Sequence, residues 1–247
     1  MNNFIPVLLY HHIGEEQGAT SEADFAKHLS WLVDNGYHCL SLPEFQQRLS
    51  QVSLSGGTRR EVMITFDDGY ADIYTSAFPV LKHFNIKATA FLITDRIGRG
   101  GYLDWPAVIK LQESCVIDCQ SHSHTHSHWQ SLVDLREDLL KSRRLLAKHL
   151  NKPAEDFDTL AWPWGVCNEQ WEDLAGDAGF TTQFLVQTAA VLPGKGRLKL
   201  PRITCDAMPL WRFIAVMKTL RLSLGNVPLL NRASYSYRQL RGGFGYQ

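Results

Sequence analysis

The sequence predicts an α/β protein in which a parallel sheet closes into a (β/α) barrel within a single domain. Short apolar runs of strand length alternate along the chain with longer segments whose apolar residues have helical spacing. About seven such strand–helix units follow one another, which is typical of a barrel. The length of 247 residues, with 45% hydrophobic and 20% charged residues, suits one large domain with a substantial core.

The first strand is expected at residues 7–10, a continuous apolar run typical of a strand that is buried on both faces. Residues 21–35 follow as a helix, because apolar side chains recur there at helical spacing and Gly36 stops the pattern. A short strand at 37–40 completes the first unit.

The second unit begins with a helix start signal. Ser41 and Glu44 have the spacing of a capping box, with a proline at the first helical position, and predict a helix to about residue 49. The polar segment 50–60 then reads as a loop. The partly β-branched run 62–64 predicts a buried central strand.

A third helix is expected over residues 70–84, where Pro79 indicates a break or a late start. Residues 87–93 predict a strand. A flexible loop at 98–101 precedes Asp104, which has the character of a helix cap, and that helix runs to about residue 113.

The second half of the chain repeats the alternation by the same criteria. It predicts strands at 116–119, 157–161 and 180–186, a loop at 191–200, and helices at 132–150, 169–178 and 208–222. The last of these helices is basic and amphipathic, so it either closes the barrel, which we favour, or lies on a membrane surface.

Two adjacent carboxylates end the central strand. Neighbouring residues of a strand point to opposite sides, so Asp67 and Asp68 need a turn to face one site, and Gly69 permits it. A histidine-rich segment follows the strand at 116–119, some fifty residues on. One carboxylate and two imidazoles would make a three-ligand metal site with an open position, and the second carboxylate would be free to act as a base.

These motifs resemble those of the polysaccharide deacetylase family, the NodB-homology or carbohydrate esterase family 4 domains. The resemblance rests on Thr-Phe-Asp-Asp-Gly at 65–69 and His-Ser-x-x-His at 122–126, and it extends roughly over residues 6–203. It implies a distorted, incomplete (β/α) barrel. It also implies a divalent metal held by Asp68, His122 and His126, with Asp67 as general base and the backbone N–H of Tyr70 donating to the oxyanion. Zinc is expected from the ligand types, and cobalt, nickel or iron would suit the same set.

Two histidine pairs fit the family pattern, so the ligands must be chosen between His122/His126 and His124/His128. In the family an acidic residue, an apolar one, a small one and a serine precede the first ligand. The segment 118–121 places His122 in that position, and Ser121 or Ser123 would help to orient a ligand.

The general acid is sought at the other end of the chain. The family's Leu-x-His motif is absent after residue 203, but residues 9–11 match it. This placement resembles the circularly permuted branch that deacetylates poly-N-acetylglucosamine, and it makes His11 the candidate acid, with His12 as the fallback.

The family's third motif, often Arg-x-Pro-Tyr, is matched by residues 161–164, and Ala161 replaces the arginine that orients the catalytic aspartate. Arg202 is a candidate replacement. Trp162, Pro163 and Trp164 are candidates for a wall that stacks on sugar rings or, equally, for simple packing. Trp105 is a further candidate for substrate contact, although its place at a helix start favours packing.

Charge and cysteine content bound the partners and the compartment. Lysine plus arginine equals aspartate plus glutamate at 25 each, which gives no basis for nucleic-acid binding. Five scattered cysteines do not form a disulfide framework, and Cys115 and Cys119 are expected to be small core residues. No signal peptide or spanning segment is recognised, so a cytoplasmic location is expected.

The resemblance implies a metal-dependent hydrolase that removes N-acetyl groups from an N-acetylhexosamine-containing polysaccharide or glycoconjugate and releases acetate. The alternatives are a C–N hydrolase that acts on a small cyclic or linear amide, and a barrel that binds glycan without turning it over. Residues 1–225 are expected to form the catalytic barrel, and residues 226–247 form an unassigned tail.

Overall fold

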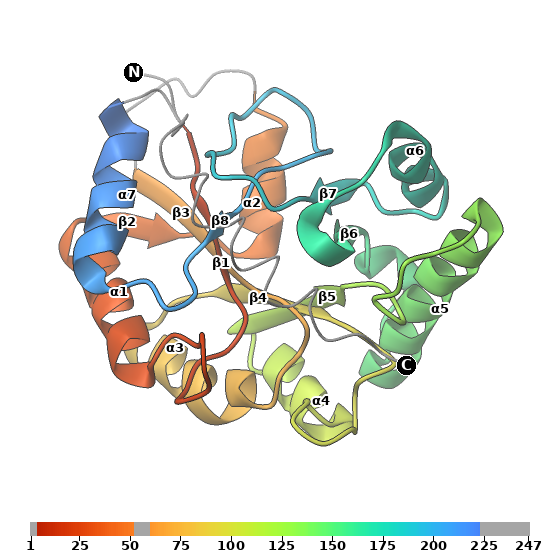
Figure 1. The fold of residues 1–247 in the computed structure, drawn as a ribbon, viewed down its shortest axis with the longest axis horizontal. Helices are drawn as coiled ribbons and strands as arrows, with labels where there is room; N and C mark the ends of the chain where they lie inside the picture. The colour runs from red at the N-terminus through yellow and green to blue at the C-terminus, as the bar shows by residue number, and fades with distance from the viewer. Residues whose placement is uncertain (1–3, 52–59, 223–247) are drawn as a thin grey trace.

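A parallel sheet curves into a half-barrel in the computed structural model, which describes residues 4–51 and 60–222 (Figure 1). Within these residues the strand order is β7-β6-β5-β4-β3-β1-β8, and β2 pairs with β3. The strands are β1 (Val7–Tyr10), β2 (Tyr37–Cys39), β3 (Arg60–Phe66), β4 (Ala88–Leu92), β5 (Ile117–Ser121), β6 (Thr159–Ala161), β7 (Thr182–Phe184) and β8 (Ile203–Thr204). Because all the strand pairs run parallel, the carboxyl ends of the strands meet at one rim.

Helices follow one another around the outside of this sheet (Figure 1). The helices are α1 (Glu22–Asp34), α2 (Leu42–Leu49), α3 (Phe78–Phe84), α4 (Trp105–Glu113), α5 (Leu132–Leu150), α6 (Glu169–Asp177) and α7 (Leu210–Leu222). Short helical turns add a π-helix at Ile73–Ala77 and 3₁₀ turns at Ala154–Asp156 and Pro163–Gly165. Helix α7 buries apolar side chains in the main core, which agrees with a barrel helix rather than a membrane-surface helix.

The gap between the edge strands β7 and β8 is bridged by an irregular segment. The amide of Leu185 donates to the carbonyl of Leu200 at 2.8 Å, and the amide of Gln187 donates to the carbonyl of Arg202 at 3.2 Å. These bonds satisfy backbone groups that a strand would otherwise use, so the barrel closes without a continuous ladder. They also place Arg202 in the segment that bridges β7 and β8, and the Arg202 side chain points into the interior of the barrel.

The interior of the half-barrel is filled by side chains from facing strands. The core cluster includes Val7, Met63, Phe91, Ala161 and Phe184, each from a different strand. Apolar residues of α2 belong to the same cluster, and Gln46 of this helix donates to Asp158 and Thr182 at the amino ends of β6 and β7, so α2 covers the end of the barrel that is opposite to the strand carboxyl ends. The bottom of the barrel is therefore sealed, and the polar end lies at the other rim.

Most predicted elements are confirmed by the structure. Helix α5 has the predicted bounds 132–150, and α2 begins with the predicted Ser41–Glu44 capping box. The helix expected over 70–84 is a π-helix followed by α3, with Pro79 in the first turn of α3, so the late start is confirmed. The two-residue strand β8 was not predicted.

One core assignment was wrong. Cys119 is fully buried in the main cluster, but Cys115 is exposed and has a positive φ of 54°. Cys115 does not share the burial of Cys119 because β5 begins only at Ile117, so Cys115 lies in the preceding turn. The expected C-terminal tail, residues 226–247, lies outside the residues that the structure describes.

Candidate active site

The acid pair lies at the carboxyl end of β3. Asp68 adopts a left-handed conformation with φ of 71°, and Gly69 follows with φ of 81°. A positive φ is uncommon for a residue with a side chain and is typical of functional positions. The predicted turn is therefore present, and it begins at Asp68 itself. Both carboxylates are almost completely buried.

The histidine segment begins at the end of β5, which is separated from β3 in the sheet by β4. His122 Nδ1 lies 2.7 Å from the carbonyl oxygen of Ala161, so this nitrogen donates and Nε2 is presented to the acid pair. His126 also has a positive φ of 56°, and its amide donates to Ser123 Oγ at 3.0 Å. This bond stabilises the turn that brings His126 back towards His122, as expected for a serine that orients a ligand.

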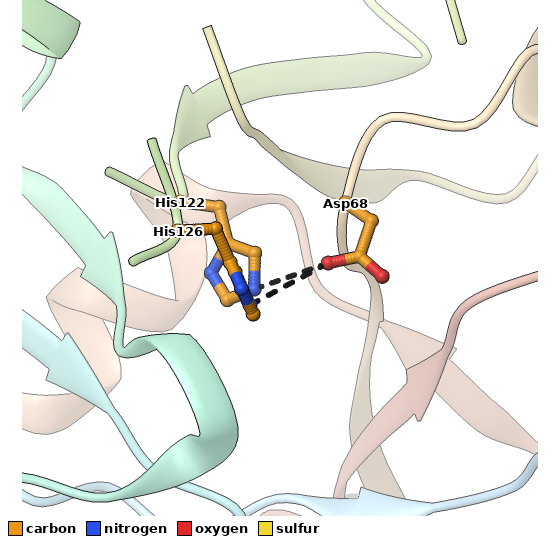
Figure 2. A group of neighbouring side chains, drawn as sticks. All are labelled: Asp68, His122 and His126. Atoms are coloured by element: carbon orange, nitrogen blue, oxygen red, sulfur yellow. Dashed lines mark ion pairs between the residues drawn. The ribbon is translucent and has the colours of Figure 1, made fainter. Parts of the chain in front are cut away.

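Asp68, His122 and His126 converge on one point (Figure 2). Asp68 Oδ1 lies 3.4 Å from His122 Nε2 and 3.8 Å from His126 Nε2, and one ligand atom from each residue lies within 4.8 Å of the others. Two zinc ligands at about 2.1 Å and a tetrahedral angle are separated by roughly 3.4 Å. The three side chains therefore have the spacing of a set that holds a single divalent ion.

The protonation states fit the same interpretation. Burial opposes the charge of Asp68, but the hydrogen bond from His122 and the charges of His11 and His126 hold its pKa well below the ordinary value. Burial and the neighbouring charge of His122 lower the pKa of His126 to about 4. A metal needs an ionised carboxylate and a neutral imidazole, and at neutral pH Asp68 and His126 have these forms.

Asp67 does not belong to this set and is held by an arginine. Arg202, which is fully buried, donates to Asp67 through Nη1 at 2.6 Å and Nη2 at 2.7 Å. Burial raises the pKa of Asp67, but the Arg202 guanidinium and the charge of His122 outweigh it, so the pKa is lowered. The Arg202 guanidinium lies over the rings of Phe91 and Phe184, in the cluster that contains Ala161. The replacement proposed for the missing third-motif arginine is therefore in contact with Asp67.

His11 follows β1 and is paired with Asp206. Its Nδ1 lies 2.6 Å from Asp206 Oδ2, and its backbone amide donates to Asp206 Oδ1 at 2.8 Å. Burial lowers the pKa of His11, but the Asp206 carboxylate, with contributions from Asp67 and Asp68, raises it to about 9. His11 is therefore a protonated imidazolium at neutral pH.

The other histidines of the two motifs face elsewhere. His12 Nδ1 lies 2.6 Å from Asp72 Oδ2, and its ring stacks on Tyr70 at a centroid distance of 3.5 Å. His124 Nδ1 lies 2.9 Å from Thr94 Oγ1, and His128 is exposed. The structure thus brings together His122 and His126, not His124 and His128.

Tyr70 follows the turn of the acid pair and forms a β-bridge with Tyr102. The two hydrogen bonds of this bridge are donated by Ala71, at 3.0 Å, and Leu103, at 2.9 Å. The bridge therefore fixes the backbone on both sides of the Tyr70 amide.

The Trp-Pro-Trp turn separates its members. Trp162 is fully buried and its Nε1 donates to Gln183 Oε1 at 2.9 Å, and Pro163 is also buried. Trp164 is 42% exposed, has a positive φ of 62°, and packs edge-on against His126. His128 stacks parallel to Trp164 at a centroid distance of 5.3 Å. The candidate wall is thus reduced to Trp164, and the substrate-contact predictions for Trp162 and Pro163 are wrong because both are enclosed in packing.

Trp105 is also not at the site. Its ring stacks on His149 of α5 at 3.9 Å, and it packs against the main core from the first position of α4. This is the packing role that a tryptophan at a helix start favours, and the prediction of substrate contact is not supported.

Asp206 and Asp72 were missed by the sequence reasoning, and each pairs with one of the two histidines that follow β1. The local signal for Asp206 is short, because the segment 201–206 holds only the β-branched pair Ile203-Thr204 between two charged residues. Asp72 lies in a helical segment and carried no such signal.

Comparison with known proteins agrees with this geometry. The family model described as polysaccharide deacetylase matches residues 55–183, just over half of the chain. The chain belongs to the polysaccharide deacetylase family. It is 28% identical over 202 residues to the putative polysaccharide deacetylase YxkH of Bacillus subtilis strain 168, covering 81% of this chain and 70% of that protein. It is also 28% identical over 200 residues to the poly-beta-1,6-N-acetyl-D-glucosamine N-deacetylase of Staphylococcus aureus strain MSSA476, covering 75% of this chain and 67% of that one.

Solved structures establish the fold. The Streptococcus pyogenes deacetylase PplD in complex with acetate matches with a TM-score of 0.77 at 24% identity, over 88% of this chain and 99% of that chain. IcaB from Ammonifex degensii matches with a TM-score of 0.78 at 22% identity, over 88% and 98%. This chain has the incomplete (β/α) barrel that the family resemblance implied. Within residues 4–51 and 60–222, each helix falls short of the length or the apolar character that crossing a bilayer demands.

Proposed function

We propose that this chain is a metal-dependent N-deacetylase that hydrolyses the acetamide of an N-acetylglucosamine-type glycan to acetate and a free amine. The observation that carries the proposal is the geometry of the acid pair. Asp68 lies with His122 and His126 in a three-ligand set, while Asp67, next to it, is held ionised by Arg202. One carboxylate is thus available to bind a metal and the other to take up a proton.

The proposed hydrolysis needs a base and an activated carbonyl. A divalent cation held by Asp68, His122 and His126 would polarise the acetamide carbonyl and lower the pKa of a bound water. Asp67 takes the proton of the attacking water, and Arg202 fixes the orientation of both Asp67 oxygens. The backbone N–H of Tyr70 is our candidate donor to the developing oxyanion.

The leaving amine needs a proton, because an amine anion is a very poor leaving group. His11 is the proposed acid: its pKa of about 9 keeps it protonated at neutral pH. Asp206 holds the His11 ring through Nδ1, which leaves Nε2 as the donating atom. The carboxylates Asp67 and Asp68 both act on the charge of His11, whereas His12 is held by Asp72. This favours His11 over His12.

The substrate class is inferred from the relatives and from Trp164. The Staphylococcus aureus relative is a deacetylase of poly-beta-1,6-N-acetyl-D-glucosamine. Trp164 is half-exposed beside His126, so its ring is placed to stack on the apolar face of a sugar. We therefore assign a β-linked N-acetylglucosamine polymer as the substrate class. Zinc remains the expected metal, by ligand type.

Ala161 argues mildly for the non-catalytic alternative, because it lacks the guanidinium that supports the catalytic aspartate in relatives. Arg202, in the segment that bridges β7 and β8, supplies that guanidinium to Asp67 instead, and this argues against the non-catalytic alternative.

The proposal is tested by mass spectrometry of N-acetylglucosamine oligomers incubated with zinc-loaded protein. We expect products that have lost acetyl groups and gained free amines while their chain length is unchanged. Intact oligomers alongside hydrolysis of small linear or cyclic amides would contradict it and favour the small-molecule alternative. Intact oligomers and intact small amides, with glycan binding detected, would favour the non-catalytic barrel.

A further inference from the structure

A row of three stacked aromatic rings extends from the candidate active site. His12, adjacent to the proposed acid, stacks on Tyr70 at a centroid distance of 3.5 Å, and Tyr70 stacks on Tyr102 at 5.0 Å. The interplanar angle is 25° in both pairs. The hydrogen bonds of the bridge between residues 69–71 and 101–103 hold the two tyrosines together. The position of Tyr102 is therefore fixed relative to the acid pair.

Tyr102, at the end of this row of rings, lines a pocket of about 310 Å³. The pocket lies between the helical segment that follows the acid pair and the start of α4. Tyr102 and Tyr74 line it with aromatic surface, and Lys110, Asp104 and Thr75 line it with polar groups. Its volume is at the lower end of the range of about 300–1,000 Å³ for ligand pockets, which suits one ring rather than an extended chain.

We propose that this pocket is a sugar-binding subsite that holds one pyranose ring of the glycan, at a distance from the acetamide that is hydrolysed. The inference rests on the proposed function, because the occupant is a further residue of the same substrate. Nothing in the deacetylation chemistry requires the pocket, so its role would be to bind longer chains and to set their register.

The chemistry of the lining favours a neutral pyranose. A pyranose has an apolar face of C–H groups and an edge of hydroxyls, so it needs flat aromatic surface beside hydrogen-bonding groups. Tyr74 and Tyr102 provide the surface. Lys110, whose Nζ lies 6.0 Å from the Tyr74 ring centroid, provides a donor, and Asp104 provides an acceptor beside the helix cap that its Oδ1 makes. One cation and one anion balance each other, which does not favour a highly charged ligand.

The position favours the substrate chain over an unrelated ligand. Ala71 lines the pocket and is three residues from Asp68 in the sequence, so the two sites share one short segment. A chain bound with one sugar near Trp164 and another at Tyr102 would pass over the acid pair between them.

The test compares oligomers of different length. Acetate release is measured for N-acetylglucosamine oligomers from dimer to hexamer, in β-1,6 and β-1,4 linkage, with wild type, Tyr102→Ala and Lys110→Ala. We expect the ratio of kcat/KM for hexamer to that for dimer to fall about tenfold in Tyr102→Ala, through KM, and about threefold in Lys110→Ala. Lys82→Ala, on the outside of α3 with its Nζ 4.4 Å from the Phe78 ring centroid, is the matched control and should leave the ratio unchanged.

Two results would overturn the subsite. An equal loss on dimer and hexamer in Tyr102→Ala would mean that Tyr102 only supports Tyr70, and an unchanged ratio in both variants would mean that the pocket is not used. Lys110 is exposed, so Lys110→Ala remains informative if Tyr102→Ala fails to fold.

Calorimetry separates this inference from the proposed function. Hexamer binding is measured for Asp67→Asn and for Asp67→Asn combined with Lys110→Ala or Tyr102→Ala. If wild type releases no acetate, the proposed function fails, and weaker binding in the double variants would still support the subsite. Equal binding in all of them would exclude it.

Discussion

Asp67 depends on a residue that lies 135 positions away in the chain, and the two meet only because the barrel closes. The Arg202–Asp67 pair is bidentate and fully enclosed, so neither charge is screened by solvent. A buried pair of this kind adds little net stability, but the removal of one partner leaves the other charge uncompensated.

Arg202→Ala should therefore lower kcat about 100-fold, since Asp67 loses its orientation. It should also cost about 3–5 kcal/mol in the free energy of unfolding. Both effects are measured by steady-state kinetics and chemical denaturation. Ala161→Arg in the same variant should restore part of the activity, because it returns a guanidinium to the position of the family's third motif. Arg202→Ala with full activity would show that Asp67 does not need this partner.

The dependence of kcat/KM on pH reports on the pair of His11 and Asp206. His11 acts in its protonated form, so kcat/KM should hold up to about pH 9 and fall above it as His11 loses its proton. In Asp206→Asn burial still lowers the pKa of His11, and only Asp67 and Asp68 remain to raise it, so the alkaline limb should move down from pH 9 towards 6.5. An alkaline limb at the same pH in both proteins would exclude His11 as the acid.

Elements with local signals were predictable, and those defined by distant contacts were not. The helix at α5 and the capping box of α2 depend on spacing within a few residues, so their bounds followed from the sequence. Strand β8 has only two residues, Ile203 and Thr204, and exists because it pairs with β1, almost two hundred positions away. Asp206 was missed for the same reason, since it is placed by β8.

In the candidate site too, residues in local motifs were predictable, and residues placed by the folded structure were not. The candidate metal ligands lie in two short motifs at strand ends, and the structure brings the three side chains within 4.8 Å of one another, as the sequence predicted. The tryptophans of the 162–164 turn could not be separated, because the turn decides which ring is buried. Trp164 and Gly165 both have positive φ, and a Cβ on Gly165 would lie 2.4 Å from Val186 Cβ. This tight contact fixes the turn with Trp162 inside and Trp164 outside.

The packing of α1 against β1 and α7 contains a buried titratable group. His28 has no exposed surface, its Nδ1 lies 3.0 Å from the Tyr10 hydroxyl, and its ring stacks on Phe213 of α7 at 4.1 Å. Burial lowers the pKa of His28 to about 4. The folded protein therefore keeps His28 neutral at pH values where the unfolded chain protonates it.

His28 should make its full contribution to the free energy of unfolding above its unfolded pKa of 6.5. This contribution, about 3 kcal/mol in total, should be lost as the pH falls from 6.5 towards 4. Chemical denaturation at several pH values checks this. In His28→Gln the loss in the free energy of unfolding between pH 6.5 and pH 4 should be smaller by that amount. An identical loss in the two proteins would show that His28 is not a buried neutral group.

At the scale of the whole molecule, the candidate metal ligands come from the ends of two strands, β3 and β5, that are separated in the sheet by β4. A bound ion would therefore link separate parts of the half-barrel and stabilise it. Zinc at about 100 times its dissociation constant should add about 2.7 kcal/mol, or about 5–10 °C in Tm for a domain of this size.

Thermal unfolding with zinc or a chelator measures this shift. It should be present in wild type and in Asp67→Asn, whose altered side chain is not a ligand, and it should be lost in Asp68→Asn. An equal shift in Asp68→Asn would place the metal elsewhere.

We propose different roles for the two adjacent acids, and acetate release tests that difference most directly. Wild type and Asp67→Asn are each loaded with one equivalent of zinc, the metal content of both is verified, and acetate release from an N-acetylglucosamine hexamer is followed. We expect release by wild type and a loss of at least about 100-fold in Asp67→Asn with its metal still bound. Equal rates from the two proteins, or no release from zinc-loaded wild type, would contradict the assignment of Asp67 as the base of an N-deacetylase.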